Sequence, residues 1–394
     1  MKKDEIFNIL FIIAGILAPY SIYGQSDRLA FISPQIIENP NSNPAYSADS
    51  RKFTGIPSLA LSLKGQLWAV WYAGKTPGED HNNYVVVSRS IDNGHTWKEE
   101  LVIDPDGDGP VRAFDPEIWI DTSGKLWVFW AQATSREEGT WALIENGTSA
   151  GLWSLQIADP DIEDIKYSAP KRLTDGVMMC KPVVLSTGEW MLPVSLWKLT
   201  TNTARAVVST DQGKTWKVRG GASVPIDVRN YDEHMIIEKI DGSLWMLVRT
   251  KYGIGESISN DRGQTWSELI PSKIQHPAAR FFIQRLNSGN LLLVKHGPID
   301  MLIGRSHLMA FISQDDGQSW SKGLLLDERA GVSYPDGQQS TDGTIFIIYD
   351  FDRRGSQNII LTSFTEDDIM INSDNTILEV YQRRKIVSKG GQNK

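Results

Sequence analysis

The sequence predicts an all-β protein, a β-propeller with six blades, on three observations. A polar–Gly–polar–apolar turn occurs six times, apolar strand-like runs flank each turn, and a Ser-x-Asp-x-Gly-x-Thr/Ser-Trp box occurs four times. A repeat of this kind is one small antiparallel sheet, and several such sheets bury their faces by stacking around an axis. The alternative is two stacked all-β domains, and the even spacing of the turns argues against it.

The six turns mark the first hairpin of each repeat. They are KGQLW at 64–68, SGKLW at 123–127, TGEWM at 187–191, DGSLW at 241–245, SGNLL at 288–292 and DGTIF at 342–346. The intervals between their glycines are 59, 64, 54, 47 and 54 residues. About eight β-prone residues precede each turn and a run such as LWAVWYA follows it, as expected of a β-hairpin.

The four boxes are interpreted as structural turns without a catalytic role. They span Ser90–Trp97, Ser209–Trp216, Ser259–Trp266 and Ser313–Trp320. In each box the Asp can accept hydrogen bonds from its own turn, the Gly supplies a positive φ, and the Trp packs against a neighbouring sheet. The 119 residues between Asp92 and Asp211 equal two repeats, so the second repeat lacks a box and carries an insertion over 135–166 instead.

The two ends of the chain lie outside these repeats. Lys2 and Lys3 precede an apolar run over 6–18, and a polar stretch begins near Gln25. This layout predicts a secretory signal peptide over 1–25 and one propeller domain over 26–390. The alternative, an uncleaved membrane anchor, is disfavoured because a membrane span needs about 20 apolar residues. We therefore expect export to the periplasm or the medium, with no stable membrane insertion after removal of the segment.

Strands at the two ends are also expected to close the ring. We expect 27–50 or 376–388 to supply a strand that completes the blade formed by the other end. Cys180 is the only cysteine, so an intrachain disulfide is excluded.

Composition excludes some partners. The net charge is −8 and no basic cluster occurs, which argues against nucleic acid. The histidines show no metal-binding spacing, so we expect no metal and no cofactor. We expect a monomer whose partner is a glycan or polysaccharide substrate.

A common register predicts the position of the site. The residues nine positions before the six turn glycines are Ile56, Asp115, Met179, Glu233, Arg280 and Tyr334. The innermost strand of every blade starts at one mouth of the central channel, so these residues should form a ring there. Four of the six are polar or ionisable, which predicts a site for a polar, anionic ligand.

The boxes and repeats over about 50–370 resemble the sialidase (neuraminidase) superfamily, also called the BNR-repeat proteins. The fourth repeat carries Asp232-Glu233, Asp241-Gly242 and Leu247-Val248-Arg249, and the sixth carries Ser333-Tyr334-Pro335-Asp336, Asp342-Gly343 and Ile348-Tyr349-Asp350. The resemblance implies a propeller of sialidase type, with Tyr334 as nucleophile and Glu233 as its base. It also implies that Arg249 and Arg305 bind the substrate carboxylate. Asp80 would be the acid, with Glu79 and His81 as alternatives.

One motif departs from the family. Sialidases begin the first blade with an F-R-I-P-like motif whose Arg completes a clamp of three, whereas this chain has Phe53-Thr54-Gly55-Ile56-Pro57. Loss of one charged hydrogen-bonding partner should weaken binding by about 2–3 kcal/mol. Arg280 and Arg229 could supply cations from other directions, which keeps an acidic sugar as the expected ligand.

The leading hypothesis is an exported glycoside hydrolase of exo-sialidase type that acts with retention of configuration. A neutral phenol avoids the repulsion that a carboxylate nucleophile would meet at an anomeric carbon bearing a carboxylate. A second hypothesis is a glycosidase or lyase on uronate-containing plant or algal polysaccharide, in which His81 or His234 could act as acid or base. A third is a carbohydrate-binding propeller without catalysis.

Overall fold

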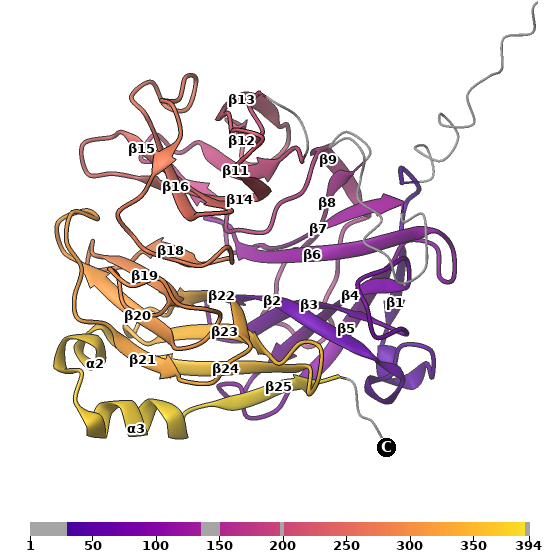
Figure 1. The fold of residues 1–394 in the computed structure, drawn as a ribbon. Coiled ribbons are helices and arrows are strands. Elements are labelled where there is room, and N and C mark those ends of the chain that lie inside the picture. The colour runs from indigo at the N-terminus through magenta and orange to yellow at the C-terminus, as the bar shows by residue number, and fades with distance from the viewer. Residues whose placement is uncertain (1–29, 135–149, 198–200, 391–394) are drawn as a thin grey trace, which may run out of the picture.

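The computed structural model of the protein describes residues 30–134, 150–197 and 201–390. Its strands form six antiparallel sheets around a central axis, which confirms the six-bladed β-propeller (Figure 1). The predicted signal peptide lies outside the described residues, as does the 135–149 part of the predicted insertion. None of the helices in the described part is long and apolar enough to cross a membrane.

The blades follow one another along the chain. The first contains β1 (Gln35–Glu38), β2 (Phe53–Leu61), β3 (Leu67–Gly74), β4 (Asn83–Ser90) and β5 (Lys98–Asp104), and the second contains β6 (Val111–Ile120), β7 (Leu126–Thr134), β8 (Gly151–Ile157) and β9 (Lys171–Asp175). The third contains β10 (Val183–Val184), β11 (Trp190–Ser195), β12 (Ala204–Ser209) and β13 (Lys217–Ala222), and the fourth contains β14 (Arg229–Glu238), β15 (Leu244–Thr250), β16 (Gly253–Ser259) and β17 (Ile270–Pro271). The fifth contains β18 (Phe282–Arg285), β19 (Leu291–His296), β20 (Leu308–Ser313) and β21 (Leu324–Asp327), and the sixth contains β22 (Val332–Gln339), β23 (Ile345–Phe351), β24 (Asn358–Phe364) and β25 (Lys385–Lys389). Helices α2 (Glu366–Ile371) and α3 (Asp374–Gln382) connect β24 to β25, and two short 3-10 helices, Pro40–Ser42 and Ala48–Ser50, follow β1.

The predicted exchange of strands between the chain ends is wrong. β1 pairs with β5 at the outer edge of the first blade, and β25 pairs with β24 at the outer edge of the sixth. The ring closes instead through the innermost strands β2 and β22. Asp336 accepts hydrogen bonds from Ser58 Oγ at 2.7 Å and from the Leu59 amide at 2.8 Å. Because these side-chain bonds join the first and sixth blades directly, closure needs no shared strand.

The boxes are structural turns, as predicted. Each Asp accepts from the hydroxyl of its own Ser at 2.8 Å and from the backbone amide four residues later at 2.8–2.9 Å. The residue before each box glycine is left-handed as well, with φ between 58° and 62°. The Thr or Ser side-chain hydrogen bonds lower the pKa of Asp211, Asp261 and Asp315 to about 2.

All four box turns also join neighbouring blades through their glycines, and a Cβ at Gly94 would lie 2.5 Å from Leu361 of the sixth blade. A Cβ at Gly213 would lie 2.6 Å from the Trp127 ring of the second blade, and one at Gly317 would lie 2.6 Å from the Trp245 ring of the fourth. At Gly263 the neighbour is Met191 of the third blade, at 3.2 Å. Each turn therefore packs against the blade that precedes its own blade around the ring.

The second blade makes the same kind of contact without a box. Its loop between β8 and β9 brings Asp161 to the β2–β3 turn of the first blade, where the carboxylate accepts from the Ser62 hydroxyl and from the Lys64 amide at 3.3 Å. Arg89 of the first blade donates to the carbonyls of Ile162 at 2.5 Å and Glu163 at 3.2 Å. Specific hydrogen bonds thus replace the box packing where the motif is missing.

A buried ionic cluster lies on the axis of the ring. Lys181 Nζ, from the segment just before β10, donates to Glu117 at 2.7 Å, to Asp336 at 2.6 Å and to Ser58 at 2.9 Å. Arg280 Nη2 lies 3.3 Å from Glu117 and 3.2 Å from Asp336. The two carboxylates are completely buried. The cluster connects residues from five of the six blades.

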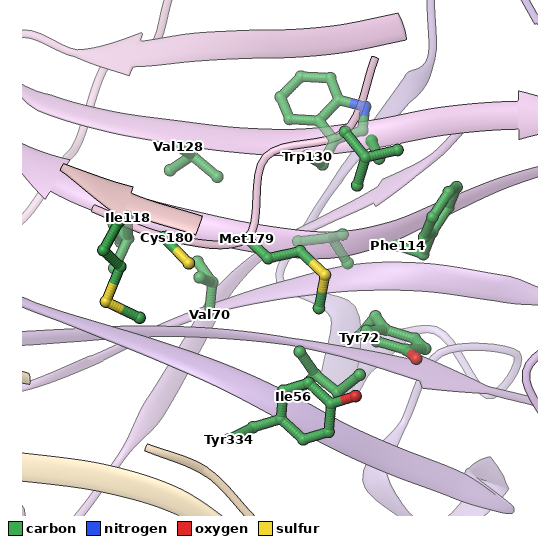
Figure 2. Close-up of a cluster of buried hydrophobic side chains, with 14 of the residues drawn as sticks. Ile56, Val70, Tyr72, Phe114, Ile118, Val128, Trp130, Met179, Cys180 and Tyr334 are labelled. Atoms are coloured by element: carbon green, nitrogen blue, oxygen red, sulfur yellow. The ribbon is translucent and has the colours of Figure 1, made fainter. Parts of the chain in front are cut away.

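Above this cluster the inner strands share one apolar core. Figure 2 shows Tyr334 beside Ile56, with Tyr72, Phe114 and Met179 in the same group of buried side chains. The residues that begin the innermost strands are therefore held on a close-packed base, which limits the movement of their side chains.

Candidate active site

The innermost strands of four blades contain a bulge near one mouth of the channel. Their pairing shifts at this point in β2, β6, β14 and β22. Each bulge contains a left-handed residue, with φ of 55° at Ile56, 47° at Asp115, 51° at Asp232 and 52° at Tyr334. Such a backbone costs about 1–3 kcal/mol at a non-glycine residue and is typical of functional sites. A bulge also changes the direction in which side chains point. The strained residues lie at the positions where the ligand site was predicted.

The predicted register coincides with these bulges. Three of its six positions, Ile56, Asp115 and Tyr334, are the left-handed residues themselves, and Glu233 directly follows the fourth, Asp232. Met179 and Arg280 occupy the same register in the third and fifth blades, and both side chains are buried.

A cavity of about 430 Å³ lies beside Tyr334. Tyr231 and Arg249 of the fourth blade, Arg305 of the fifth, and Ser333, Asp350 and Arg353 of the sixth line it. The structure therefore brings Tyr334, Arg249 and Arg305 together, as the resemblance implied. It adds Tyr231, Asp350 and Arg353, which had not been proposed as site residues.

Arg249 connects the predicted nucleophile to its predicted base. Its Nη1 donates to Glu233 Oε1 at 2.5 Å and to the Tyr334 hydroxyl at 3.4 Å. All three residues are buried. Among the described residues, no hydrogen bond joins Tyr334 directly to Glu233, and Glu233 Oε2 has no hydrogen-bond partner. Burial by itself would lower the pKa of Arg249, but the nearby Glu233 and Tyr334 raise it above its usual value. Arg249 thus stays charged.

Arg305 is held by contacts at the edge of the same cavity. Its Nη1 donates to Ser333 Oγ at 3.1 Å and its Nη2 to the Ala278 carbonyl at 3.1 Å. The guanidinium carbon lies 5.6 Å from the centre of the Tyr334 ring. These contacts hold the guanidinium group beside Tyr334 without pairing it with a carboxylate.

Arg353 is the main residue that sequence reasoning missed. Its guanidinium carbon lies 4.7 Å from the centre of the Tyr334 ring. Nη2 is 3.6 Å from Glu79 and Nη1 is 3.7 Å from Asp350. Arg353 stands three residues after Asp350, which occupies in β23 the register of Arg249 in β15. A search of the residues just beyond the second strand of each hairpin would have found it.

The loop that was expected to supply the acid contains two carboxylates, and their surroundings differ. Asp80 is buried and is hydrogen-bonded within its own loop: its carboxylate accepts from the Thr76 hydroxyl at 2.5 Å and from the Asn82 amide at 2.9 Å. Glu79 points to Arg353. Neither Glu79 nor the half-buried His81 is among the residues that line the cavity, but Glu79 contacts the lining residue Arg353. The geometry therefore favours Glu79 among the three alternatives.

Asp115 is a buried carboxyl group close to Glu79, Glu233 and Arg353. Burial raises its pKa to about 8, Arg112 opposes the rise, and Glu79 and Glu233 add to it. At neutral pH this side chain is mostly uncharged, so it can donate a hydrogen bond to an oxygen of a ligand.

Three other residues considered from the sequence are not in the cavity. Arg229 is paired with Asp232, with nitrogen–oxygen distances of 2.8 and 2.6 Å, and Arg280 belongs to the axial cluster. His234 is buried, with its Nε2 2.9 Å from the Arg205 carbonyl, and burial lowers its pKa to about 4. Each has a structural partner, which explains why it is not available to a ligand.

Comparisons with known proteins agree with this architecture. Residues 65–347 match the family described as BNR repeat-like domain. A sialidase of Bacteroides fragilis is 26% identical over 328 residues, which cover 75% of this chain and 59% of that protein. A sialidase of Micromonospora viridifaciens is 24% identical over 384 residues, covering 87% and 57%. The chain thus spans less than two-thirds of the length of either curated relative.

Solved structures show the same fold. The Hadza microbial sialidase Hz136 superposes with a TM-score of 0.65 at 20% identity, over 82% of this chain and 67% of that one. The intramolecular trans-sialidase of Ruminococcus gnavus, solved with oseltamivir carboxylate, superposes with a TM-score of 0.63 at 16% identity, over 82% and 96%. At this level of identity the likeness establishes the propeller.

Proposed function

Because the chain belongs to the BNR-repeat proteins of the sialidase superfamily, we propose that it is a glycoside hydrolase that releases a terminal acidic sugar from a glycan or polysaccharide. The observation that carries the proposal is the cavity in which Arg249 and Arg305 lie beside Tyr334, with Glu233 bonded to Arg249. A site that only bound sugars would have no need of a buried tyrosine with a carboxylate behind it.

Substrate binding would use the two guanidinium groups. A planar guanidinium can donate two parallel hydrogen bonds to a carboxylate, which selects both charge and orientation. The neutral carboxyl of Asp115 would donate to a hydroxyl or carbonyl oxygen of the same sugar. Together these contacts would place the anomeric carbon next to the Tyr334 hydroxyl.

In the first step, the Tyr334 oxygen attacks the anomeric carbon as the bond to the leaving group breaks. The phenolic proton passes to Glu233. Arg249 lies between the two residues in the free protein, so it must turn from Glu233 to the incoming carboxylate before this transfer. Substrate binding would thereby free the base that the nucleophile requires.

The leaving oxygen would take a proton from Glu79, the loop carboxylate that reaches into the site. In the second step Glu79 removes a proton from water, and the water oxygen displaces Tyr334, which regains its proton from Glu233. Two displacements at the same carbon give retention of configuration. The proposed location is outside the cytoplasm, on the basis of the amino-terminal segment of the sequence.

Substitution of the nucleophile and its base tests the proposal. Tyr334→Phe and Glu233→Gln should each reduce kcat by about 100-fold or more, the usual contribution of a nucleophile or general base. The substrates are glycosides of N-acetylneuraminate, other keto-acid sugars and uronic acids, and product configuration is followed by NMR. The matched controls are Tyr167→Phe and Glu238→Gln, whose side chains bond to Glu38 and Ser186 away from the cavity. Full activity of both site variants on the true substrate would disprove the mechanism.

A further inference from the structure

We propose that Arg353 of the sixth blade supplies the cation that the first blade lacks at Gly55, and that it binds the ligand carboxylate together with Arg249 and Arg305. This inference rests on the proposed function, because it assigns a third group to the same carboxylate site. It also identifies the ligand by its chemistry, as a sugar acid whose carboxylate can be reached from the fourth, fifth and sixth blades.

The first argument is steric. A Cβ at Gly55 would lie 2.8 Å from Arg353 Cγ and would overlap Arg353 Cδ. It would also lie 3.4 Å from Asp350 Oδ2. The aliphatic part of Arg353 therefore fills the space that any side chain at position 55 would enter. Arg353 in this position and a larger residue at 55 exclude each other.

The second argument is that the guanidinium of Arg353 keeps donors available. Its nearest carboxylate oxygens, on Glu79 and Asp350, lie at 3.6 and 3.7 Å, beyond good hydrogen-bond distance. Its Nη1 is buried and makes no hydrogen bond to any residue that the structure describes. A buried donor without an acceptor is costly, and a ligand carboxylate would satisfy it.

Arg51, just before the innermost strand of the first blade, shows what a structural arginine looks like. Its two terminal nitrogens bond to the two oxygens of Glu99 at 2.5 and 2.6 Å, and one also donates to the Tyr46 carbonyl at 2.9 Å. Both terminal nitrogens of Arg51 therefore already have acceptors, although Arg51 is close in sequence to the missing motif. Arg353 differs because it lines the cavity and lies over the Tyr334 ring.

The third argument concerns the position of the nucleophile. Tyr334 has Arg249 3.4 Å from its hydroxyl, and Arg305 and Arg353 beside its ring. A carboxylate bound by all three would lie next to the hydroxyl that attacks. The arrangement keeps a three-cation site although Gly55 carries no side chain.

The test is the preference for a carboxylate over the matching alcohol. Calorimetry would measure Kd for the dehydrated glycal of N-acetylneuraminate and for galacturonate, each against its carboxyl-reduced alcohol. The parent should prefer the acid in at least one pair. Arg353→Ala should reduce this preference about 10- to 100-fold, as expected for one charged, bidentate contact, and Arg353→Lys should reduce it less. The control is Arg262→Ala, which removes an equal charge from an exposed position in the fourth-blade box, outside the cavity, and should change the preference less than about threefold.

Variants at Gly55 test the steric argument separately. Gly55 has a backbone conformation that alanine can adopt, so Gly55→Ala should fold, displace Arg353 and reduce the preference as Arg353→Ala does. Gly55→Arg combined with Arg353→Ala should regain part of it. Thermal unfolding of every variant shows whether a loss reflects the site or the fold.

The outcomes separate this inference from the proposed function. If Arg353→Ala keeps the full preference while the parent hydrolyses its substrate, the inference fails and the proposed function stands. If the parent shows no hydrolysis but Arg353→Ala loses the preference, the inference stands and the proposed function fails. A parent without any preference for the acid, or a Gly55→Ala variant indistinguishable from it, contradicts the inference.

Discussion

Tyr334 combines an unfavourable backbone with a demanding position. Its φ of 52° lies in the left-handed region, its ring packs into the core, and its hydroxyl faces Arg249. Ile56 has a similar φ although it is β-branched, and its amide donates to Asp350 at 3.0 Å. The left-handed backbone of these two residues is locally destabilising, and the packing of the core offsets this effect. The Tyr334 side chain is thereby held in a fixed position at the cavity.

The proposed role of Glu79 as the acid can be tested by substitution. Glu79→Gln should slow hydrolysis of a substrate with a sugar leaving group by about 100-fold, and should affect a nitrophenyl glycoside far less, because nitrophenolate leaves without a proton. Asp80→Asn should instead lower the midpoint of thermal unfolding, since it weakens the hydrogen bonds within the loop. Rates on both substrates and melting curves distinguish the two. A strong dependence on the leaving group in Asp80→Asn, with none in Glu79→Gln, would assign the acid to Asp80.

Among the elements, the box turns combine hydrogen bonds within one turn with contacts between neighbouring blades. Each box carboxylate bonds within its own turn, and Gly213, Gly263 and Gly317 allow close contact with the preceding blade. The second blade meets the first through Asp161 instead. A motif of eight residues thus determines how one blade meets the next, and a longer loop can replace it.

The boxes predict a loss of stability in acid. Their hydrogen bonds lower the Asp pKa in the folded state, from 3.8 to about 2 at Asp261, so their contribution is present above about pH 4 and is lost as the pH falls towards 2. Asp261→Asn should lower the midpoint of thermal unfolding at pH 7 and flatten its decline between pH 4 and 2. The comparison is Asp164→Asn, at an exposed carboxylate. An equal decline in Asp261→Asn and the parent would show that this box carboxylate does not contribute to acid sensitivity.

For the molecule as a whole, the axial cluster replaces a shared closing strand. Lys181, Arg280, Glu117 and Asp336 form a balanced group of two positive and two negative side chains in which both carboxylates are fully buried. The inner strands of the first, second and sixth blades meet there through these bonds. The ring is thus held at its centre by charge and at its periphery by apolar packing between blades.

Removal of one charge from the cluster should be strongly destabilising. Lys181→Met leaves two buried carboxylates with one cation, and should reduce the free energy of unfolding by about 3–5 kcal/mol, measured in urea. Adding Glu117→Gln should restore part of the loss, because the one remaining cation, Arg280, is then balanced by the one remaining carboxylate, Asp336. Lys98→Met is the control and should cost less than about 1 kcal/mol, because the Lys98 side chain is mostly exposed and its partner Glu100 keeps its ion pair with Arg89. A cost for Lys181→Met no larger than that of the control would contradict the role of the cluster.

The ring and part of its site follow from local sequence patterns. Turn glycines, box carboxylates and strand-like runs act over a few residues, so six repeats and a nine-residue register were sufficient to locate Ile56, Asp115 and Tyr334 at their bulges. Arg249 and Arg305 were found with the help of a family resemblance, and they lie together in the cavity.

Folding in three dimensions decided the remaining features. Whether Asp80 or Glu79 contacts a residue of the cavity depends on which carboxylate is hydrogen-bonded within the loop itself. Whether Arg229 and Arg280 are free depends on carboxylates that the fold brings to them. The contact between Gly55 and Arg353 joins the first blade to the sixth, across nearly the whole chain. Short-range patterns carry no information about such a contact, because the space left by a missing side chain is defined only after the ring has closed.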